Sequence, residues 1–235
     1  MKVIVFGATG FVGNEVVNRC RKDSDITEVF AITRRPLLDD ISEDAKVKTI
    51  LHSNFLEYPQ SLLDQISGSE CCLWCIGGRH TQISRWKTQE EYAQVSVEYT
   101  LAAATAFAES LAPHLDGKPF RFIFCSGHAT ELDQNKSLWV MGPTRKVKGK
   151  AELSLFSLAD MHPKVFECFT IRPCGIYQPN PSLKDIFLTS VVLPSLHVEE
   201  LAITMVDIGK RGFNERIVEH ETIKRHGRGL LETST

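Results

Sequence analysis

Residues 3–13 read Val-Ile-Val-Phe-Gly-Ala-Thr-Gly-Phe-Val-Gly, an apolar run that passes directly into three evenly spaced glycines. The run predicts a buried strand, and the amphipathic stretch from Asn14 to Arg21 predicts a helix. In such a unit the first glycine permits a tight turn, the second lets a pyrophosphate approach the backbone, and the third lets the helix pack closely on the sheet. The N–H groups and the dipole at the helix start favour a phosphate. We therefore predict a dinucleotide-binding turn; the alternative is a purely structural one.

Short apolar runs alternate with longer amphipathic stretches along the rest of the chain. The Ala-rich stretch from Glu90 to Leu111 predicts a long helix. Because parallel strands need crossover connections, this alternation predicts an α/β fold: a Rossmann-type, doubly wound parallel sheet with helices on both faces. The expected strands are Val3 to Phe6, Val29 to Ile32, Val47 to Leu51, Cys71 to Ile76, Phe120 to Cys125 and Phe166 to Ile171.

The composition is that of an ordinary globular protein. The 235 residues predict one domain, residues 1–235, and 43% hydrophobic with 24% charged residues exclude a disordered chain. A formal charge of −2 creates no field that would attract nucleic acid or a membrane. No metal-ligand spacing is found among the eight histidines, so no metal is expected. No apolar run approaches the ~20 residues of a membrane span, and without a secretory leader we predict a cytoplasmic protein that binds a small molecule, with a homodimer or a protein partner also open.

The C-terminal part, residues 173–235, is expected to form a small extension on the substrate side. Pro and Gly cluster from Pro173 to Ser195, which predicts a loop interrupted by the apolar run Ile186 to Leu193. The stretch from Val198 to Gly227 predicts two helices, broken near Gly209 and Gly212 and ending on a basic turn.

The end of the second expected strand distinguishes NAD from NADP. An acidic residue there would bind the 2′-hydroxyl of NAD, but the sequence has Arg34 and Arg35, whose guanidiniums suit the 2′-phosphate of NADP. NADP(H) is therefore favoured over NAD(H); the alternative is that both arginines lie in a solvated loop. Adenine is expected near Asn54 and Phe55, and the nicotinamide side of the cleft near Gly77.

These motifs together resemble an atypical or extended short-chain dehydrogenase/reductase, nearest to the branch that includes the NmrA-like proteins. The resemblance rests on the glycine-rich turn, Arg34-Arg35, Gly77-Gly78, Ser126 and Arg172-Pro173, and covers nearly the whole chain. It implies an NADP(H)-dependent oxidoreductase of specialised metabolism that acts on a small carbonyl, hydroxyl or enone compound. The expected cofactor-binding residues are Gly7, Thr9, Gly10, Phe11, Val12, Gly13, Arg34, Arg35, Asn54, Gly77, Lys148 and Pro173.

The family's chemistry is carried by Ser, Tyr and Lys, with Tyr four residues before Lys so that both lie on one helix face. Ser126 matches the serine and Lys148 the lysine, but Thr144 stands where the tyrosine is expected. Threonine is shorter than tyrosine, and its hydroxyl cannot reach the pKa range in which a phenol exchanges protons. The usual proton relay therefore lacks its acid.

Several side chains could replace that acid, and two other functions stay open. His128, two residues after Ser126, is the first candidate, followed by Tyr92, Tyr99 and Tyr177. One alternative function is an isomerase, dehydratase or cyclase without net redox chemistry that uses Ser126, His128 and Lys148. The other is a non-catalytic binding protein that senses NADP(H).

Overall fold

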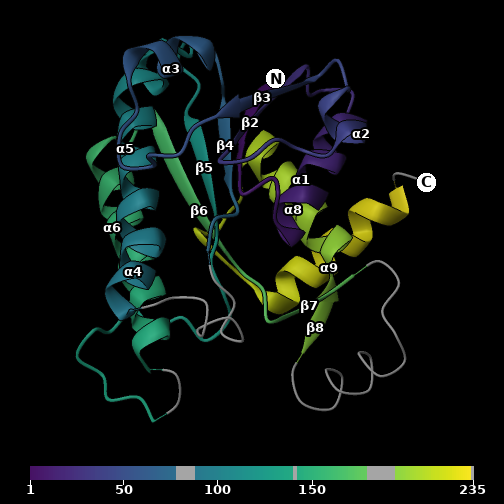
Figure 1. Cartoon of the computed structure of the whole chain (residues 1–235). Coiled ribbons are helices and arrows are strands. Elements are labelled where there is room, and N and C mark those ends of the chain that lie inside the picture. Colours follow the sequence, from purple (N-terminus) through teal and green to yellow (C-terminus); the bar gives the residue numbers. More distant parts are fainter. Residues whose placement is uncertain (78–87, 140–141, 179–193, 234–235) are drawn as a thin grey trace.

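The computed structural model describes residues 1–77, 88–139, 142–178 and 194–233. Over these residues the chain forms a seven-stranded parallel sheet with helices on both faces (Figure 1). The strands are β1 (Lys2–Phe6), β2 (Glu28–Thr33), β3 (Val47–Leu51), β4 (Cys71–Trp74), β5 (Phe120–Cys125), β6 (Phe166–Arg172) and β9 (Ile217–Glu219). Their order, β3-β2-β1-β4-β5-β6-β9, extends the Rossmann order by one strand, so the predicted fold class is confirmed.

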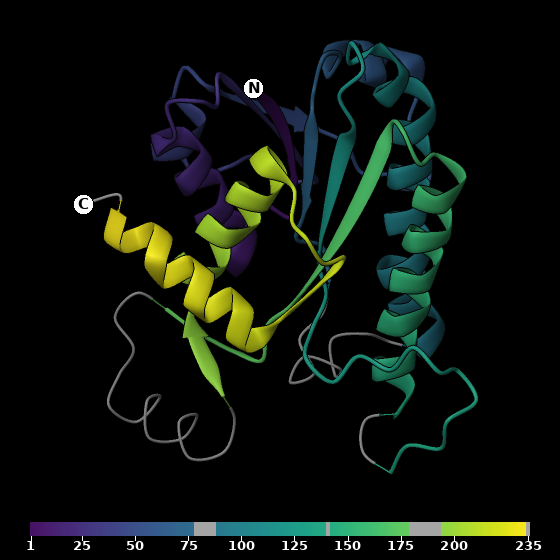
Figure 2. The ribbon, with the colours of Figure 1, turned by 180° about the vertical axis from the view of Figure 1, so that it is seen from behind.

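The helices form one layer on each face of the sheet (Figures 1 and 2). One layer holds α3 (Gln60–Gln65), α4 (Gln89–Ala93), α5 (Tyr99–Ser110) and α6 (Gly142–Met161). The other side holds α1 (Phe11–Lys22), the short α2 (Asp39–Ser42), α8 (Val198–Arg211) and α9 (His220–Thr233).

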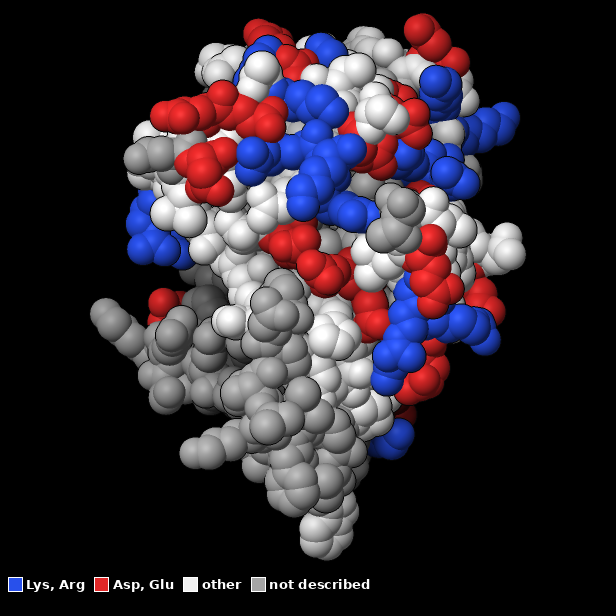
Figure 3. All heavy atoms as spheres, turned by 90° about the vertical axis from the view of Figure 1, so that its right-hand side faces the viewer, with Lys and Arg blue, Asp and Glu red and all other residues white. Residues whose placement is uncertain are grey.

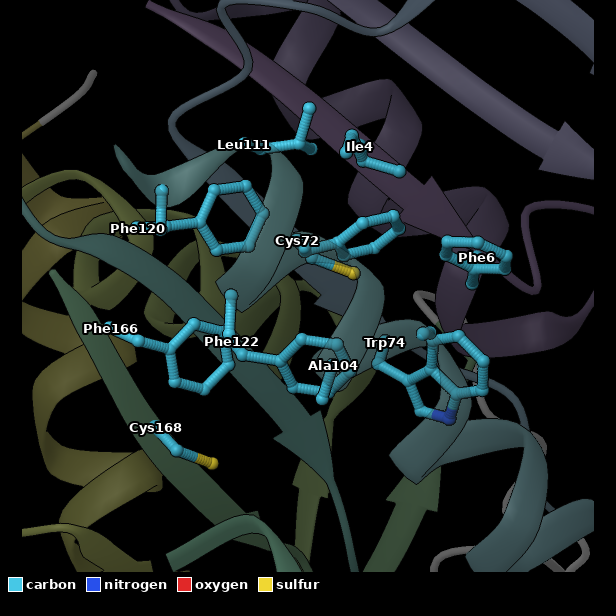
Figure 4. Packing of buried hydrophobic residues seen from close by; sticks show 14 of the residues in the cluster. Ile4, Phe6, Cys72, Trp74, Ala104, Leu111, Phe120, Phe122, Phe166 and Cys168 are labelled. Carbon is cyan, nitrogen blue, oxygen red and sulfur yellow. The ribbon is translucent and has the colours of Figure 1, made fainter. Parts of the chain in front are cut away.

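Alternating side chains of the strands fill two different cores. The face toward α5 and α6 is rich in aromatic rings, with Trp74 lying 4.4 Å from Phe6 between ring centroids and Phe120 stacked at 6.0 Å on Phe166 (Figure 4). The opposite face, covered by α1 and α8, is built from smaller side chains such as Val5. Burying each large apolar side chain stabilises the fold by roughly 1.5–3 kcal/mol, so both faces tie the helices to the sheet.

Element boundaries differ from the predictions at three places. The first helix begins at Phe11 rather than Asn14, because the glycine turn leads straight into it. The fourth strand was expected to reach Ile76 but ends at Trp74. The long helix expected from Glu90 to Leu111 is present but contains a π-helical turn, Gln94–Glu98, between α4 and α5. Such turns have no hydrophobic period that would distinguish them from an α-helix in the sequence.

The C-terminal part departs most from expectation. Two short parallel strands, β7 (Gly175–Tyr177) and β8 (Ser195–His197), lie at the ends of the expected loop. The apolar run 186–193 and Gly78 lie outside the described residues. No break occurs near Gly209: α8 continues through it, and a Cβ there would lie 2.7 Å from Cys71 Sγ, so this glycine lets the helix approach β4.

The second C-terminal helix was also predicted too short. α8 ends before Gly212, β9 follows, and α9 continues past the expected basic turn to Thr233. Residues 173–235 thus contribute a strand to the main sheet and two helices to the layer over it, besides the small β7–β8 sheet.

No helix in the described part of the chain combines the length and the apolar character that crossing a bilayer requires. On the side of α1, α2 and α9, Lys and Arg are interspersed with Asp and Glu (Figure 3). The cytoplasmic location and the single-domain boundary stay predictions.

Candidate functional site

The candidate site lies at the carboxyl edge of the sheet, where all the parallel strands end. The strand order reverses between β1 and β4, and ligands of open α/β sheets bind at such a switch point. The glycine turn follows β1 at this point, and Ser126 and Pro173 follow β5 and β6 of the same sheet. The topology therefore brings the predicted cofactor turn and the predicted catalytic residues to one edge.

Close backbone contacts explain the first and third glycines of the turn. Gly7 has φ +76°, and a Cβ on it would lie 2.7 Å from the Cys75 carbonyl oxygen. A Cβ on Gly13 would lie 2.2 Å from the Gly7 carbonyl oxygen, so α1 can start here only with glycine. A Cβ on Gly10 would meet only that same carbonyl oxygen, at 3.1 Å. Apart from this one tight contact, no described atom lies within 4 Å of that position, so the second glycine leaves room for a pyrophosphate to approach the backbone.

The start of α1 presents its dipole to an anion. No side chain caps the helix, and its first turn holds no acidic residue, whereas basic residues occupy its last turn. By contrast, α8 begins with a capping box made by His197 and Glu200, and the Thr88 side chain caps α4. Thr9 is exposed in the turn and Val12 packs on the core beneath it. The geometry fits a dinucleotide diphosphate.

The turn after β2 exposes two cations beside this site. The Thr33 hydroxyl donates a 2.5 Å hydrogen bond to the Arg35 carbonyl oxygen and so fixes the turn. Arg34 and Arg35 are both exposed, and in the described part of the chain neither guanidinium has an ion pair. Both charges are therefore available to an anionic ligand.

The residues expected around adenine have mixed surroundings. Asn54 is exposed, and its Oδ1 accepts a hydrogen bond from the Leu56 N–H at 3.2 Å. Phe55 is buried edge-on against Phe6, with 5.6 Å between ring centroids. Among the described residues, no atom lies within 4 Å of the position of a Cβ on Gly77. Phe55 thus belongs to the core, and Asn54 is the exposed member of the pair.

Ser126 and Lys148 are brought together at the end of β5. Lys148 Nζ donates to the Ser126 carbonyl oxygen at 3.0 Å, while the buried Ser126 hydroxyl donates to Glu152 Oε1 at 2.5 Å. Lys148 and Glu152 are one turn apart on α6 and face the same strand end. Burial lowers the pKa of the Lys148 ammonium, and the neighbouring Cys125 and Glu152 oppose this shift.

A buried ion pair supports the serine, and the sequence analysis missed it. Glu152 has no exposed surface, and its carboxylate accepts hydrogen bonds from Arg172 Nη2 at 2.5 Å and Nε at 3.1 Å. Arg172 Nη1 also donates to Glu219 at 2.9 Å. Burial alone would lower the pKa of Arg172, but its bonds to the two carboxylates raise it. The only sequence signal for Glu152 is its spacing of four residues from Lys148.

Thr144 and His128 occupy different surroundings. Thr144 is buried on α6, one turn before Lys148, where the missing tyrosine was expected. The side chain of His128 is half exposed; its backbone N–H donates to the Pro173 carbonyl oxygen at 2.8 Å, and its ring Nδ1 lies 4.0 Å from Glu219 Oε2. His128 is therefore accessible to solvent near the end of β5, whereas Thr144 is buried.

The tyrosines considered as substitutes make packing contacts. Tyr99 lies edge-on to Phe55 at 5.7 Å, and Tyr177 is 5.8 Å from the His197 ring. Burial raises the pKa of Tyr92, although a bond with Ser96 lowers it. A raised pKa makes a phenol a poorer acid at neutral pH. Among the described residues, no group of His, Cys, Asp and Glu is arranged to hold a metal ion.

Comparisons with known proteins give two partial sequence matches. No family model matches the chain. Leucinostatins biosynthesis cluster protein T of Purpureocillium lilacinum is 25% identical over 193 residues, which cover 82% of this chain and 64% of that protein, so the chain spans less than two thirds of this relative. A polyketide synthase-nonribosomal peptide synthetase of Aspergillus clavatus is 30% identical over 101 residues, 42% of this chain and 2% of that protein.

Solved structures match over most of the chain. Gre2 of Candida albicans, in complex with NADPH, has a TM-score of 0.70 at 15% identity and covers 94% of this chain and 78% of its own. The dTDP-glucose 4,6-dehydratase DesIV of Streptomyces venezuelae, with NAD bound, has a TM-score of 0.67 at 16% identity over 100% of this chain and 81% of its own. MoeE5, in complex with UDP-glucuronic acid and NAD, has a TM-score of 0.67 at 17% identity over 93% of this chain and 75% of its own. The chain therefore has the Rossmann-type α/β fold of these proteins, whose structures contain bound NAD or NADPH.

Proposed function

We propose that this protein is an NADP(H)-dependent oxidoreductase of the short-chain dehydrogenase/reductase type that acts on a small carbonyl, hydroxyl or enone compound. The observation that carries the proposal is the start of α1, where Gly7 and Gly13 close the turn, Gly10 leaves it open, and no side chain caps the helix. A dinucleotide diphosphate is the ligand that this combination suits. The nucleotides bound to Gre2, DesIV and MoeE5 support the same assignment.

Arg34 and Arg35 support NADP(H) over NAD(H). The two guanidiniums are exposed at the end of β2 and have no ion pair within the described residues. A 2′-phosphate would give each of them a charge-assisted hydrogen bond.

The relatives support a role in specialised metabolism. One is named for the leucinostatins biosynthesis cluster, and the other is a polyketide synthase-nonribosomal peptide synthetase. The substrate proposed here is correspondingly a small carbonyl compound or the alcohol derived from it.

The proposed chemistry divides between the cofactor and the chain. A reduced nicotinamide supplies a hydride when it is bound. The side chains at the end of β5 would then hold the substrate oxygen and exchange its proton, with Lys148 and Ser126 adjacent and His128 accessible to solvent nearby.

Dinucleotide titration of the purified protein tests the proposal. We expect NADPH to bind, and Gly10→Glu to abolish binding because a carboxylate at this position would occupy the diphosphate site and repel it. Gly229→Glu is the control, because that glycine lies on α9 and a Cβ there would meet no atom within 4 Å. Calorimetry would measure both variants, and undiminished affinity in Gly10→Glu would contradict this placement of the cofactor.

The arginines give a second, independent prediction. Arg34→Ala and Arg35→Ala should each weaken NADPH binding about tenfold or more, since a hydrogen bond between charged groups contributes roughly 1.5–3 kcal/mol. NADH binding should change little, because NADH lacks the 2′-phosphate. Arg225→Ala, which removes an exposed arginine on α9, is the matched control. Equal losses for NADPH and NADH would assign the arginines to another part of the ligand.

A non-catalytic, NADP(H)-sensing protein is the second candidate function. Thr144 supplies no phenol, and the Ser126 proton is bound by Glu152, so two usual catalytic groups are altered while the diphosphate turn is intact. Following NADPH absorbance with a panel of carbonyl compounds separates the two functions. Oxidation of NADPH supports the reductase, and NADPH binding without oxidation across the panel supports the sensing protein or an enzyme without net redox chemistry.

A further inference from the structure

The hydroxyl group of Ser126 donates its hydrogen bond to the buried Glu152 carboxylate. Ser126 Oγ lies 2.5 Å from Glu152 Oε1, and the Glu152 side chain has no exposed surface. An ionised carboxylate only accepts hydrogen bonds, so the one hydroxyl proton of Ser126 must point toward it. Toward a ligand, the Ser126 oxygen is then left with its lone pairs and acts as an acceptor.

Arg172 forms an ion pair with the Glu152 carboxylate. Two guanidinium nitrogens, Nη2 and Nε, hold the carboxylate at 2.5 and 3.1 Å. Protonating Glu152 would leave the buried Arg172 without this counter-charge, which costs several kcal/mol. Because an arginine does not release its proton in a protein, the proton of Ser126 also cannot be passed along this chain to Glu219.

Thr130 does not release the Ser126 proton either. Its Oγ1 lies 3.2 Å from Ser126 Oγ, but its own hydroxyl donates a 2.6 Å hydrogen bond to the Gly127 carbonyl oxygen. Each of the two hydroxyls thus has a partner for its one proton.

Lys148 has protons left to donate. Its ammonium carries three N–H donors, and one of them bonds the Ser126 carbonyl oxygen at 3.0 Å. Nζ lies against the backbone of Gly127, 2.9 Å from where a Cβ would be. Over the described residues Lys148 has no ion pair that would fix the other two donors.

From these contacts we propose that Lys148, and not Ser126, supplies the proton to a substrate oxygen held at the end of β5, and that Glu152 is the positioning residue that keeps Ser126 an acceptor. The inference deepens the proposed function and, as a reaction, rests on it. In the reduction of a ketone, a bound reduced nicotinamide would supply the hydride to the carbonyl carbon as the C=O π bond breaks. The oxygen receives a proton from Lys148 Nζ, leaving a neutral amine that regains a proton from water. Burial lowers the pKa of this ammonium, in the direction that proton donation near neutral pH requires.

The protonation state of Glu152 is the first test, made on the protein without any ligand. Infrared difference spectra between wild type and Ser126→Ala, with isotope-labelled glutamate, should show a carboxylate band that shifts when the hydroxyl is removed. Ser126→Ala keeps the Glu152–Arg172 pair and should fold. A protonated-carboxyl band that moves in this variant would place the proton on Glu152, leave the Ser126 proton free for a ligand, and overturn the proposal.

The titration of Lys148 is the second test. Competitive labelling with acetic anhydride from neutral to alkaline pH, mapped by mass spectrometry, should give Lys148 a midpoint below that of N-acetyl-lysine amide in the same solution. Ser126→Ala should leave this midpoint unchanged, because Lys148 bonds the backbone oxygen. Glu152→Gln should lower it further, because a neighbouring negative charge is removed. If Glu152→Gln does not fold, wild type and Ser126→Ala decide; a midpoint at or above the reference overturns the proposal.

Both tests separate this inference from the proposed function. They report on Ser126, Glu152 and Lys148 in the free protein, whereas the proposed function is tested by NADPH binding and oxidation. A protein that binds no dinucleotide but gives both expected results would leave the division of proton roles standing and remove the cofactor from it.

Discussion

At position 144 a buried threonine stands one turn before Lys148, where a phenol would complete the usual relay. Thr144→Tyr would place a phenol on the same helix face as the ammonium, whose charge lowers a phenol's pKa. If the wild type oxidises NADPH slowly with a carbonyl compound, this variant should be faster, by less than the roughly 10²–10⁴ that a positioned acid contributes, because Lys148 already donates a proton. Stopped-flow absorbance of NADPH measures the rate.

Thr144→Phe is the matched control for that variant. It adds the same ring at a buried position, with an expected overpacking cost of roughly 1–3 kcal/mol, but no hydroxyl. Equal rates in the two variants would show that bulk, and not the phenol, changes turnover.

Individual residues of the site could be predicted only where a motif marks them. Ser126 and Lys148 follow from their places after a strand and on a helix, and the structure brings them together. Glu152 looks like any acidic helix residue, and its partner Arg172 lies on the following strand. Only the parallel pairing of β5 with β6 puts that strand end beside Ser126, so the buried pair requires the three-dimensional structure.

At the scale of elements, α9 crosses α8 at a glycine. A Cβ on Gly227 would lie 2.4 Å from the Glu200 backbone oxygen, so Gly227→Ala must push the helices apart and should cost roughly 1–3 kcal/mol of unfolding free energy. Two residues further on the same helix, Gly229 has open space, and Gly229→Ala should stabilise by about 0.5–1 kcal/mol. Urea denaturation measures both. Equal effects would mean that helix propensity alone governs α9.

Elements were predictable in proportion to their length. The five- to seven-residue strands β1, β2, β3, β5 and β6 carry enough apolar residues to be recognised. The three-residue strands β7, β8 and β9 show too little alternation to stand out from loops. The helices of the C-terminal part were predicted, and the break at Gly212 is confirmed, but Gly209 was taken as a break where α8 uses it for close packing on β4.

At the scale of the whole molecule, alternation of strands and helices was sufficient to predict the sheet, because crossover connections permit few topologies. The same pattern does not predict the contact that joins the C-terminal part to the end of β6. Buried His220, the first residue of α9, accepts a 3.1 Å hydrogen bond at Nδ1 from the Cys174 N–H that follows β6. Two segments distant in sequence thus meet at one imidazole.

This contact makes the stability of the molecule depend on pH. Accepting at Nδ1 requires a neutral ring, and burial lowers the pKa of His220, aided by Lys224 and His128 and opposed by Glu221 and Glu200. The unfolded chain, with a His pKa near ~6.5, therefore binds the proton first as pH falls. The contribution of His220 to the free energy of unfolding is complete above about pH 6.5. It is lost as pH falls below this value, at up to about 1.4 kcal/mol per pH unit.

Urea denaturation from neutral to mildly acidic pH should show the free energy of unfolding falling with pH. The fall should be less steep in His220→Asn, which keeps a hydrogen-bond acceptor but does not titrate. His114→Asn, at an exposed histidine on the opposite edge of the sheet, should keep the wild-type slope; an unchanged slope in His220→Asn would assign the pH dependence to other groups.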